Sequence, residues 1–323
     1  MKVFMTAGEP SGDALGAALM AALRRERPGI AFQGLAGPQM QAQGMASLFP
    51  IDELAIMGII EVLPKYFHLK ARIRQTAEAA LAASPDVVVT IDSPDFSLRV
   101  AALIKEARPD QRIVHYVAPT VWAWRPERAR KMLGLIDQVL ALFPFEPPYF
   151  ERVGLACDFV GHPIAEEPRV TEAEIAAFRA AHALPEGPVL ALLPGSRKSE
   201  IARFFSTFAA AVTRSRFREV PIVLPTLPHL AAEVRRLSAQ LPSKPVLLTG
   251  EGETPPEASR ARRVAIATAS HALAASGTIS LELAAARTPM VIGYRSSWLS
   301  RKIARRNFLV DTITLINLVT ETR

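Results

Sequence analysis

The sequence contains only one cysteine, Cys157, among 323 residues. A single thiol excludes a disulfide framework and a cysteine-based zinc cluster within one chain, and it fits a protein of the reducing cytosol. The sequence also lacks the G-x-G-x-x-G turn of dinucleotide-binding folds. This absence argues against an NAD-dependent enzyme.

Long apolar runs are also absent. No stretch reaches the roughly 18 apolar residues that a transmembrane helix needs. The N-terminal sequence MKVFMTAGEPSGD has one lysine and an apolar run too short for a signal peptide. We therefore expect that any contact with a membrane is made from one side.

Acidic residues are outnumbered by basic ones. The chain has 31 Asp and Glu against 38 Lys and Arg, which gives a net charge of +7. This balance suits a nucleic acid, a phosphorylated substrate or an acidic membrane surface, and alone it does not choose among the three.

Short apolar runs alternate with helical patterns along the whole chain, which predicts an α/β protein with mostly parallel sheets covered on both faces. In the first half we expect strands at 3–6, 31–35, 86–92, 112–118, 138–143 and 157–161, with helices at 11–25, 66–83, 95–107, 126–135 and 146–153. In the second half we expect strands at 188–195, 221–226, 245–250, 264–268 and 289–294, with helices at 198–215, 229–240 and from about 277.

The pattern is interrupted at mid-chain. Residues 163–187 hold prolines, acidic residues and an amphipathic stretch, which we interpret as a linker and the first helix of a second domain. The sequence therefore predicts two facing Rossmann-like domains, 1–165 and 166–323. Ligands of such sheets bind beyond the carboxyl ends of the strands, so a cleft between the domains is expected.

The first predicted strand ends in AGEPSGD at 7–13, where Glu9 and Ser11 are candidate substrate-binding residues. Glycines in this turn let the backbone approach a ligand, and the following helix offers free N–H groups to an anion. The alternative is a tight strand-to-helix turn with Ser11 as the N-cap.

Two carboxylates follow the 86–92 strand. Asp92 stands at its carboxyl end, where a base could take a proton from a sugar hydroxyl, and Asp95 is the alternative base one turn further on. The competing interpretation is that both residues only cap the next helix.

The segment HYVAPTVWAWR at 115–125 holds two of the three tryptophans. Trp122 and Trp124 could form a wall for a sugar ring or an acyl chain, with Arg125 beside them. The alternative is hydrophobic packing between the domains. His115 lies inside a predicted strand and is better interpreted as a core histidine.

In the second half of the chain, another predicted strand ends in a turn before a helix, in LLPGSR at 192–197. Ser196 could cap the next helix, with Arg197 in its first turn. An arginine is disfavoured at the positive end of a helix dipole unless an anion lies there, and guanidinium binds phosphate with two N–H groups. The alternative is a solvated surface arginine.

A second turn of this kind lies in ASGTISLELA at 275–284. Ser276, Gly277 and Thr278 open a helix whose N–H groups could bind a diphosphate, and Glu282 could accept both ribose hydroxyls. The alternative is an ordinary capped helix with an exposed glutamate.

Two segments, 65–74 and 294–308, interleave basic and apolar residues. Basic amphipathic helices of this type can lie on an anionic membrane. The alternative for each is a solvated basic helix face.

Taken together, these motifs resemble the lipid-A-disaccharide synthase family over nearly the whole chain. The motifs that carry the resemblance are AGEPSGD (7–13), GLAGPQM (34–40), MGIIEVL (57–63), IDSPDF (91–96), HYVAPTVWAWR (115–125), LFPFE (142–146), GHP (161–163), LLPGSR (192–197), ASGTISLE (275–282), PMVIGYR (289–295) and LINL (315–318).

The resemblance implies a GT-B glycosyltransferase fold and an inverting reaction that needs no metal and no cofactor. UDP-diacylglucosamine and diacylglucosamine 1-phosphate would give the β-linked disaccharide 1-phosphate and UDP. It implies that Asp92 is the general base, that residues 276–282 form the UDP-binding element, and that Arg197 and Asn317 matter for activity.

The resemblance further implies a peripheral protein on the cytoplasmic face of the inner membrane, with no nucleic-acid partner and with a second copy of the chain as a candidate partner. Family members usually run some tens of residues past LINL, whereas this chain stops at Arg323. In this fold the final helices cross back to brace the first domain, and in some members they exchange between subunits.

Two other functions are compatible with the motifs. One is another UDP-N-acetylglucosamine-dependent transferase or epimerase, which would need no surface for acyl chains. The other is a non-catalytic nucleic-acid or lipid-binding protein that uses the charge of +7. The second leaves Asp92, Arg197 and Glu282 without a role.

Overall fold

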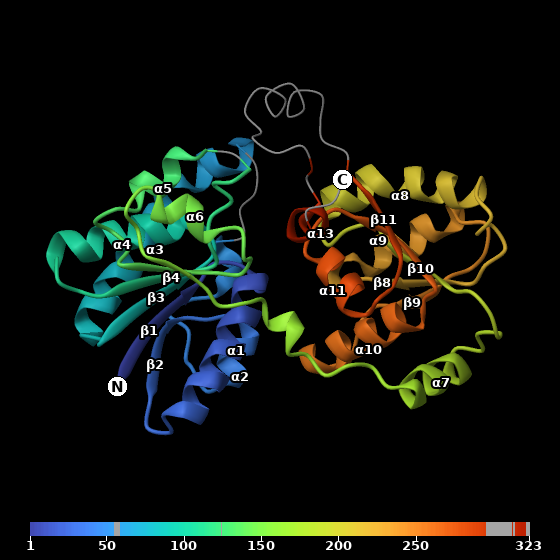
Figure 1. The fold of residues 1–323 in the computed structure, drawn as a ribbon, viewed down its shortest axis with the longest axis horizontal. Coiled ribbons are helices and arrows are strands. Elements are labelled where there is room, and N and C mark those ends of the chain that lie inside the picture. The colour runs from blue at the N-terminus through green and yellow to red at the C-terminus, as the bar shows by residue number, and fades with distance from the viewer. Residues whose placement is uncertain (55–58, 124, 295–311, 313, 321–323) are drawn as a thin grey trace. The chain divides into compact units, whose positions relative to one another are not determined.

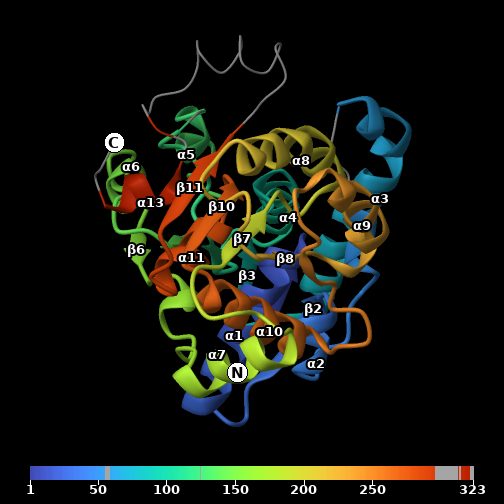
Figure 2. The same ribbon diagram turned by 90° about the vertical axis from the view of Figure 1, so that its right-hand side faces the viewer.

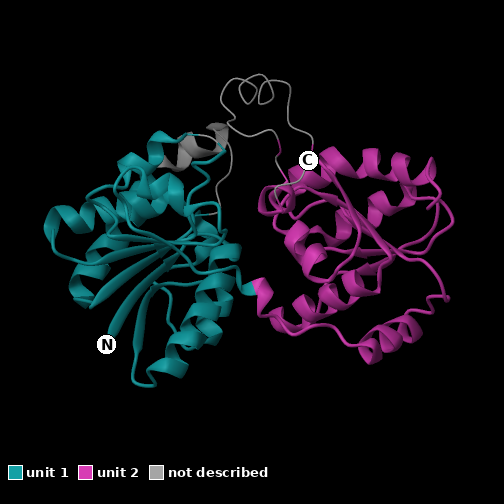
Figure 3. Cartoon of the chain, viewed as in Figure 1, with its two compact units in different colours: residues 1–163 teal, residues 164–323 magenta. Residues whose placement is uncertain are grey.

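The computed structural model describes residues 1–323 except 55–58, 124, 295–311, 313 and 321–323, and the side chains of 59–66 are also outside the described part. The chain forms two compact units, Met1–Pro163 and Ile164–Arg323 (Figure 3). Each is an α/β unit built on one parallel sheet.

The sheet of unit 1 has the strand order β2-β1-β3-β4-β5-β6, and every neighbouring pair is parallel. Its central strands read as nearly continuous apolar runs, as expected for strands covered on both faces. The strands are β1 (Lys2–Ala7), β2 (Ala31–Leu35), β3 (Val87–Ile91), β4 (Ile113–Tyr116), β5 (Gln138–Ala141) and β6 (Cys157–Phe159).

Helices cover both faces of this sheet (Figures 1 and 2). One core packs α1 and α2 against the strands, with Met20 and Met40 fully buried, and the other packs α3 and α4, with Ile73 and Val100 buried. The helices are α1 (Pro10–Glu26), α2 (Pro38–Ala42), α3 (Ile59–Ala83), α4 (Pro94–Ala107), α5 (Glu127–Lys131) and α6 (Pro147–Glu151).

The sheet of unit 2 has the order β11-β10-β7-β8-β9 and is also parallel throughout. The strands are β7 (Leu190–Leu193), β8 (Ile222–Pro225), β9 (Val246–Leu248), β10 (His271–Ala275) and β11 (Met290–Gly293). The helices are α7 (Glu172–Ala181), α8 (Lys198–Thr213), α9 (Ala231–Leu237), α10 (Pro255–Thr268), α11 (Ile279–Ala285) and α13 (Leu315–Val319). Phenylalanines of α8 fill one core, and α10 and α11 fill the other.

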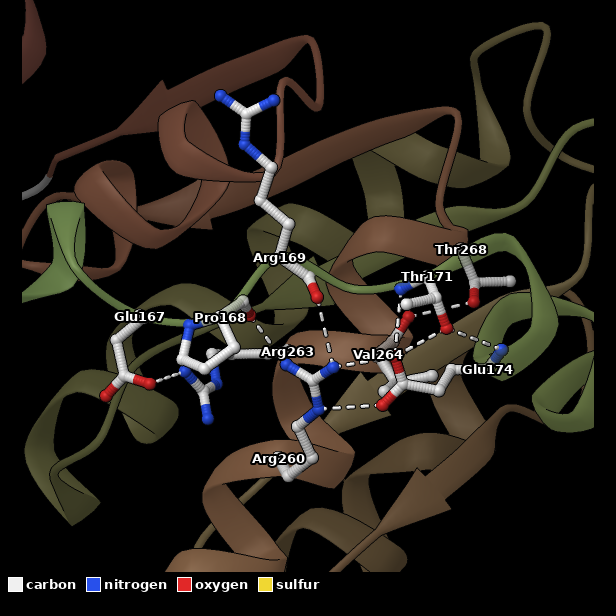
Figure 4. Close-up of polar contacts among 9 residues, drawn as sticks. All are labelled: Glu167, Pro168, Arg169, Thr171, Glu174, Arg260, Arg263, Val264 and Thr268. Atoms are coloured by element: carbon white, nitrogen blue, oxygen red, sulfur yellow. Dashed lines mark hydrogen bonds and ion pairs between the residues drawn. The ribbon is translucent and has the colours of Figure 1, made fainter.

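The segment that follows Pro163 is fastened to α10 (Figure 4). Arg260 donates to the backbone oxygen of Pro168 at 2.7 Å and to the Glu174 carboxylate, and Arg263 pairs with Glu167. The backbone N–H of Thr171 and the Arg260 guanidinium lower the pKa of Glu174 to about 2. Residues 167–174 are thus held to unit 2, and Glu174 also closes the capping box that starts α7.

One expected strand is wrong. The apolar run at 264–268 is the last part of α10, which starts with Pro255 and a capping box between Thr254 and Glu257. The run looks like a strand because Val264, Ala265 and Ile266 all lie in the buried core. The actual strand is β10, which was not expected because its alanines give a weak strand signal.

Candidate active site

Each sheet has one point where the strand order reverses. In unit 1 the chain leaves β1 toward β2 and returns to place β3 on the other side of β1, and in unit 2 the same happens around β7, between β8 and β10. Ligands of open α/β sheets bind outside the carboxyl ends of the strands at such a switch point. The turns after β1, β3, β7 and β10 are therefore the expected binding positions.

In unit 1 the turn after β1 carries Glu9 and the turn after β3 carries Asp92. The two turns lie in contact with each other. A Cβ added to Gly8 would lie 2.6 Å from Ser93 Oγ. Gly8 therefore permits the close approach of the two turns to one another, whereas we expected it to permit the approach of a ligand.

Four residues without the freedom of glycine have left-handed backbone here. They are Asp92 (φ 52°), Ser93 (φ 44°), Val117 (φ 79°) and Arg125 (φ 54°). Positive φ is unfavourable for such side chains, above all for β-branched valine, and costs on the order of 1–3 kcal/mol per residue. Among the described residues, the other non-glycine residues with positive φ are Ser84, Ala183 and Arg287, each one or two residues past the end of a helix, where such conformations are common. In the described residues the strain therefore lies directly after β3, directly after β4 at Val117, and at Arg125 further along the segment that follows β4.

The two candidate bases have different surroundings. Asp92 is half-buried. Its backbone N–H donates to the backbone oxygen of Tyr116 at 2.9 Å, and its backbone oxygen accepts a hydrogen bond from Ser97 Oγ at 2.7 Å. The Asp95 side chain is 79% exposed and pairs with Arg128 at 3.0 Å. Asp92 is thus fixed at the strand end, whereas Asp95 is a solvated partner of an arginine.

In the AGEPSGD turn, Ser11 is not the N-cap of the helix that follows. Helix α1 begins at Pro10 with Glu9 at the N-cap, so Ser11 lies within the first turn and is exposed. The capping group of this motif is Asp13, which is buried and accepts from the N–H groups of Gln39 at 2.8 Å and Met40 at 3.0 Å. It therefore ties the start of α2 to α1.

The tryptophan segment turns inward. Trp122 is 6% exposed, donates its Nε1 hydrogen to Glu146 at 3.2 Å and meets the ring of Phe145 edge-on at 5.3 Å. Trp122 thus packs within unit 1, which differs both from a wall open to a ligand and from the packing between the domains given as the alternative. Trp124 lies outside the described residues, and Arg125 is exposed.

His115 lies in the core, as expected. It is fully buried on β4, and its Nδ1 lies 2.8 Å from Thr90 Oγ1. Burial, with a smaller effect of Arg128, lowers its pKa to about 4. The imidazole is therefore neutral at physiological pH.

Glu146, which was not among the expected site residues, is a buried carboxyl beside Trp122. Burial raises its pKa to about 7, against the opposing effect of the N–H donors of Phe143 and Trp122. The folded protein therefore binds more protons than the unfolded chain between the usual pKa of 4.5 and about 7. The contribution of Glu146 to stability is present at low pH and falls as the pH rises through this window.

We therefore expect Glu146→Gln to gain stability relative to the parent protein as the pH rises from about 5 to about 8. Thermal melting at a series of pH values measures the difference in Tm between the two proteins. Glu151→Gln, which changes an exposed carboxylate on α6, is the control. A Tm difference that does not vary with pH would contradict the assignment.

In unit 2, β7 and β10 are neighbours, so the turns after them lie side by side. Arg197 is the N-cap of α8 and half-exposed, and it donates to Glu200 at 3.2 Å. The carboxylate of Glu200 also accepts from the N–H groups of Ser196 and Arg197. Ser196 is therefore not the cap we expected, and Glu200 already supplies a negative charge at this helix end.

The turn after β10 is open to solvent. Gly277 and Thr278 are exposed, Ser276 is half-exposed, and α11 starts directly after them. Glu282 accepts from Arg262 of α10 at 2.9 and 3.1 Å. This pair holds the carboxylate in place and leaves each oxygen a further lone pair. Asn317 lies on α13, which packs against α11.

Gly277 offers a clean test of ligand approach. A Cβ at this position would meet no atom within 4 Å, so Gly277→Ala is expected to fold normally. If the backbone touches a diphosphate here, the added methyl group should raise the KM for the UDP-sugar by about tenfold. Gly29→Ala, at an exposed position of unit 1 where an added Cβ would also meet no atom within 4 Å, is the control for general effects on the protein. An unchanged KM would remove this turn from the site.

In the part of the chain that the structure describes, no three His, Cys, Asp or Glu side chains are grouped so that they could hold a metal ion. Among the same residues, no helix combines the length and the apolar character needed to cross a bilayer.

Comparison with known proteins decides the family. The family model of lipid-A-disaccharide synthetase matches residues 3–323. The chain is 57% identical to the lipid-A-disaccharide synthase of Ruegeria pomeroyi over 325 residues, which cover all of this chain and 81% of that protein. The chain belongs to the lipid-A-disaccharide synthase family. The synthase of Rhodospirillum centenum is 44% identical over 98% of this chain and 78% of its own length. The resemblance found in the motifs is thus confirmed, and with it a glycosyltransferase of lipid A biosynthesis.

Solved structures confirm the fold. A UDP-GlcNAc 2-epimerase from Neisseria meningitidis bound to UDP-GlcNAc has a TM-score of 0.65 at 13% identity, over 99% of this chain and 90% of that chain. Anabaena HepE in complex with UDP-glucose has a TM-score of 0.55 at 12% identity, over 95% of this chain and 88% of that chain. At these identities the likeness establishes the fold alone.

Proposed function

We propose that the chain transfers diacylglucosamine from its UDP derivative to diacylglucosamine 1-phosphate, with inversion, to give the disaccharide 1-phosphate and UDP. The main support is the placement of the motif residues. Asp92 and Glu9 stand at the switch point of one sheet, and Arg197 and Ser276 stand at the switch point of the other. Family membership supports the same activity.

Unit 2 is the proposed donor unit. Arg197 and the exposed N–H groups after β10 would bind the diphosphate, and Glu282, oriented by Arg262, would accept the ribose hydroxyls. Positive groups placed at the diphosphate stabilise UDP as it leaves, so this arrangement can act without a metal ion.

Unit 1 is the proposed acceptor unit. A sugar hydroxyl is a weak acid, and a carboxylate placed beside it helps by taking the proton as the new bond forms. Asp92 is the proposed base because its backbone is fixed at the end of β3, with the strained turn of β4 next to it.

A mass-spectrometric assay of the full chain tests this proposal. With both acylated substrates we expect the disaccharide 1-phosphate and UDP, also in the presence of EDTA. Turnover of UDP-N-acetylglucosamine alone, with no reaction of the acylated donor, would favour an epimerase or another transferase. Loss of activity with EDTA and recovery with magnesium would contradict the metal-free mechanism.

We also propose that the protein lies on the cytoplasmic face of the inner membrane. In the described part of the 65–74 segment, Phe67 is 80% exposed and Lys70 and Arg74 are exposed. The 294–308 segment lies outside the described residues apart from Tyr294. An exposed phenylalanine beside basic residues is typical of helices that enter an anionic interface.

We expect Phe67→Ser to weaken binding to anionic vesicles by roughly 1 kcal/mol, or about fivefold, because the ring no longer enters the interface. Co-sedimentation with vesicles measures the effect. Phe159→Ser, which removes another exposed phenylalanine of unit 1, is the control. Equal binding of all three proteins would contradict a role of this segment.

Sedimentation of the full chain would test the homodimer that the resemblance suggests.

A further inference from the structure

Unit 1 has a hollow of about 520 Å³ between α4 and the segment 125–135. Four basic side chains line it, together with two carboxylates, so the hollow carries an excess of two positive charges. The charged lining residues are Asp95, Arg99, Arg125, Glu127, Arg128 and Lys131.

We infer that this hollow binds the phosphate monoester of the sugar acceptor. The inference rests on the proposed function and adds to it a site on unit 1 that is separate from the base. A phosphate monoester carries close to two negative charges at neutral pH, which matches the excess charge of the hollow.

Among the described residues, some of the charged side chains in the hollow form ion pairs and others do not. Asp95 is neutralised by Arg128, whose side chain is only 14% exposed. Within the described part of the chain, Arg99 and Lys131 have no hydrogen bond or ion pair. These two cations come from different elements, α4 and α5, so an anion between them would satisfy both.

The position of the hollow suits the acceptor. It begins at Pro94 and Asp95, in the turn of α4 that directly follows Asp92, and continues along the same helix to Arg99 and Ala102. An acceptor whose hydroxyl lies at Asp92 carries its phosphate elsewhere on the ring. A phosphate site close to the base but distinct from it is therefore required.

The backbone supports the same assignment. Arg125 lines the hollow with φ 54°, an unfavourable conformation for an arginine. Strained residues of this kind gather at ligand sites, where the surrounding structure holds them.

The test compares two acceptors, diacylglucosamine 1-phosphate and the same sugar without its phosphate, in the full chain. Arg99→Ala and Lys131→Ala are made singly and together. Arg130→Ala, which removes a charge from the same helix outside the hollow, is the control. All exchanged residues are exposed, so thermal melting should show normal folding.

For the phosphorylated acceptor we expect kcat/KM to fall about tenfold in each single variant and about 100-fold in the double variant. For the acceptor without phosphate we expect changes of less than about twofold, and the control should behave like the parent protein. This difference between acceptors is the specific sign of a phosphate site, because a general structural defect would affect both.

Equal losses with both acceptors, or no loss with either, would overturn the inference while the proposed function stands. If the variants also lose binding to phosphatidylglycerol vesicles and treat both acceptors alike, the hollow binds a lipid headgroup and the inference is wrong. Failure of the parent protein to turn over either acceptor would overturn the proposed function and this inference with it.

Discussion

Asp92→Asn is expected to lower kcat by at least about 100-fold, with little change in the affinity for UDP. The exchange removes the base but keeps the size of the side chain. It also keeps the backbone, because asparagine tolerates the left-handed conformation at φ 52° as well as aspartate does. Alanine would add strain at this position and confuse the result.

The matched control is Asp95→Asn, three residues further on. Asp95 is exposed and paired with Arg128, so we expect a kcat within a fewfold of the parent value. Steady-state kinetics with saturating substrates compare the two variants. If Asp95→Asn loses activity and Asp92→Asn does not, the base is one helical turn away from our assignment. If both remain active, the base lies elsewhere.

Arg197→Ala is expected to reduce kcat/KM for the UDP-sugar at least roughly 30-fold. This corresponds to a loss of about 2 kcal/mol of transition-state stabilisation, the scale of a lost charge-assisted contact. The fold should tolerate the exchange. The backbone of Arg197 has an ordinary φ of −120°, and the helix end is capped by Glu200. The lost pair with Glu200 is half-exposed and contributes little to stability.

Arg214→Ala is the matched control, since Arg214 is the exposed C-cap at the other end of the same helix. Initial rates over a range of donor concentrations, together with calorimetric binding of UDP, separate binding from turnover. Kinetics of Arg197→Ala that match those of Arg214→Ala would show that Arg197 is a solvated surface residue.

The alternation of strands and helices was predictable because each buried strand is a short apolar run bounded by turn residues. The exception is the pair formed by β10, which was not expected, and the end of α10, which was expected to be a strand. The strand β10 reads HALAA, and the end of α10 reads VAIAT. Apolar content alone favours the second as a strand, and only the capping residues Thr254 and Glu257, ten and seven positions before Val264, indicate the helix.

Candidate residues were predictable where a strand end and a reactive side chain coincide, as at Asp92 and Arg197. Local sequence could not give the partners, because these come from elements distant in sequence. Arg262 of α10 orients Glu282 of α11, and Arg128 of α5 neutralises Asp95 of α4. Glu146 escaped notice because its burial beside Trp122 depends on the packed fold.

The proposed transfer can be followed by mass spectrometry of the full chain incubated with UDP-diacylglucosamine and diacylglucosamine 1-phosphate. We expect one β-linked disaccharide 1-phosphate and one UDP for each acceptor consumed, with product formation reduced at least about 100-fold in Asp92→Asn. UDP release without a disaccharide, or the same yield from Asp92→Asn, would contradict it.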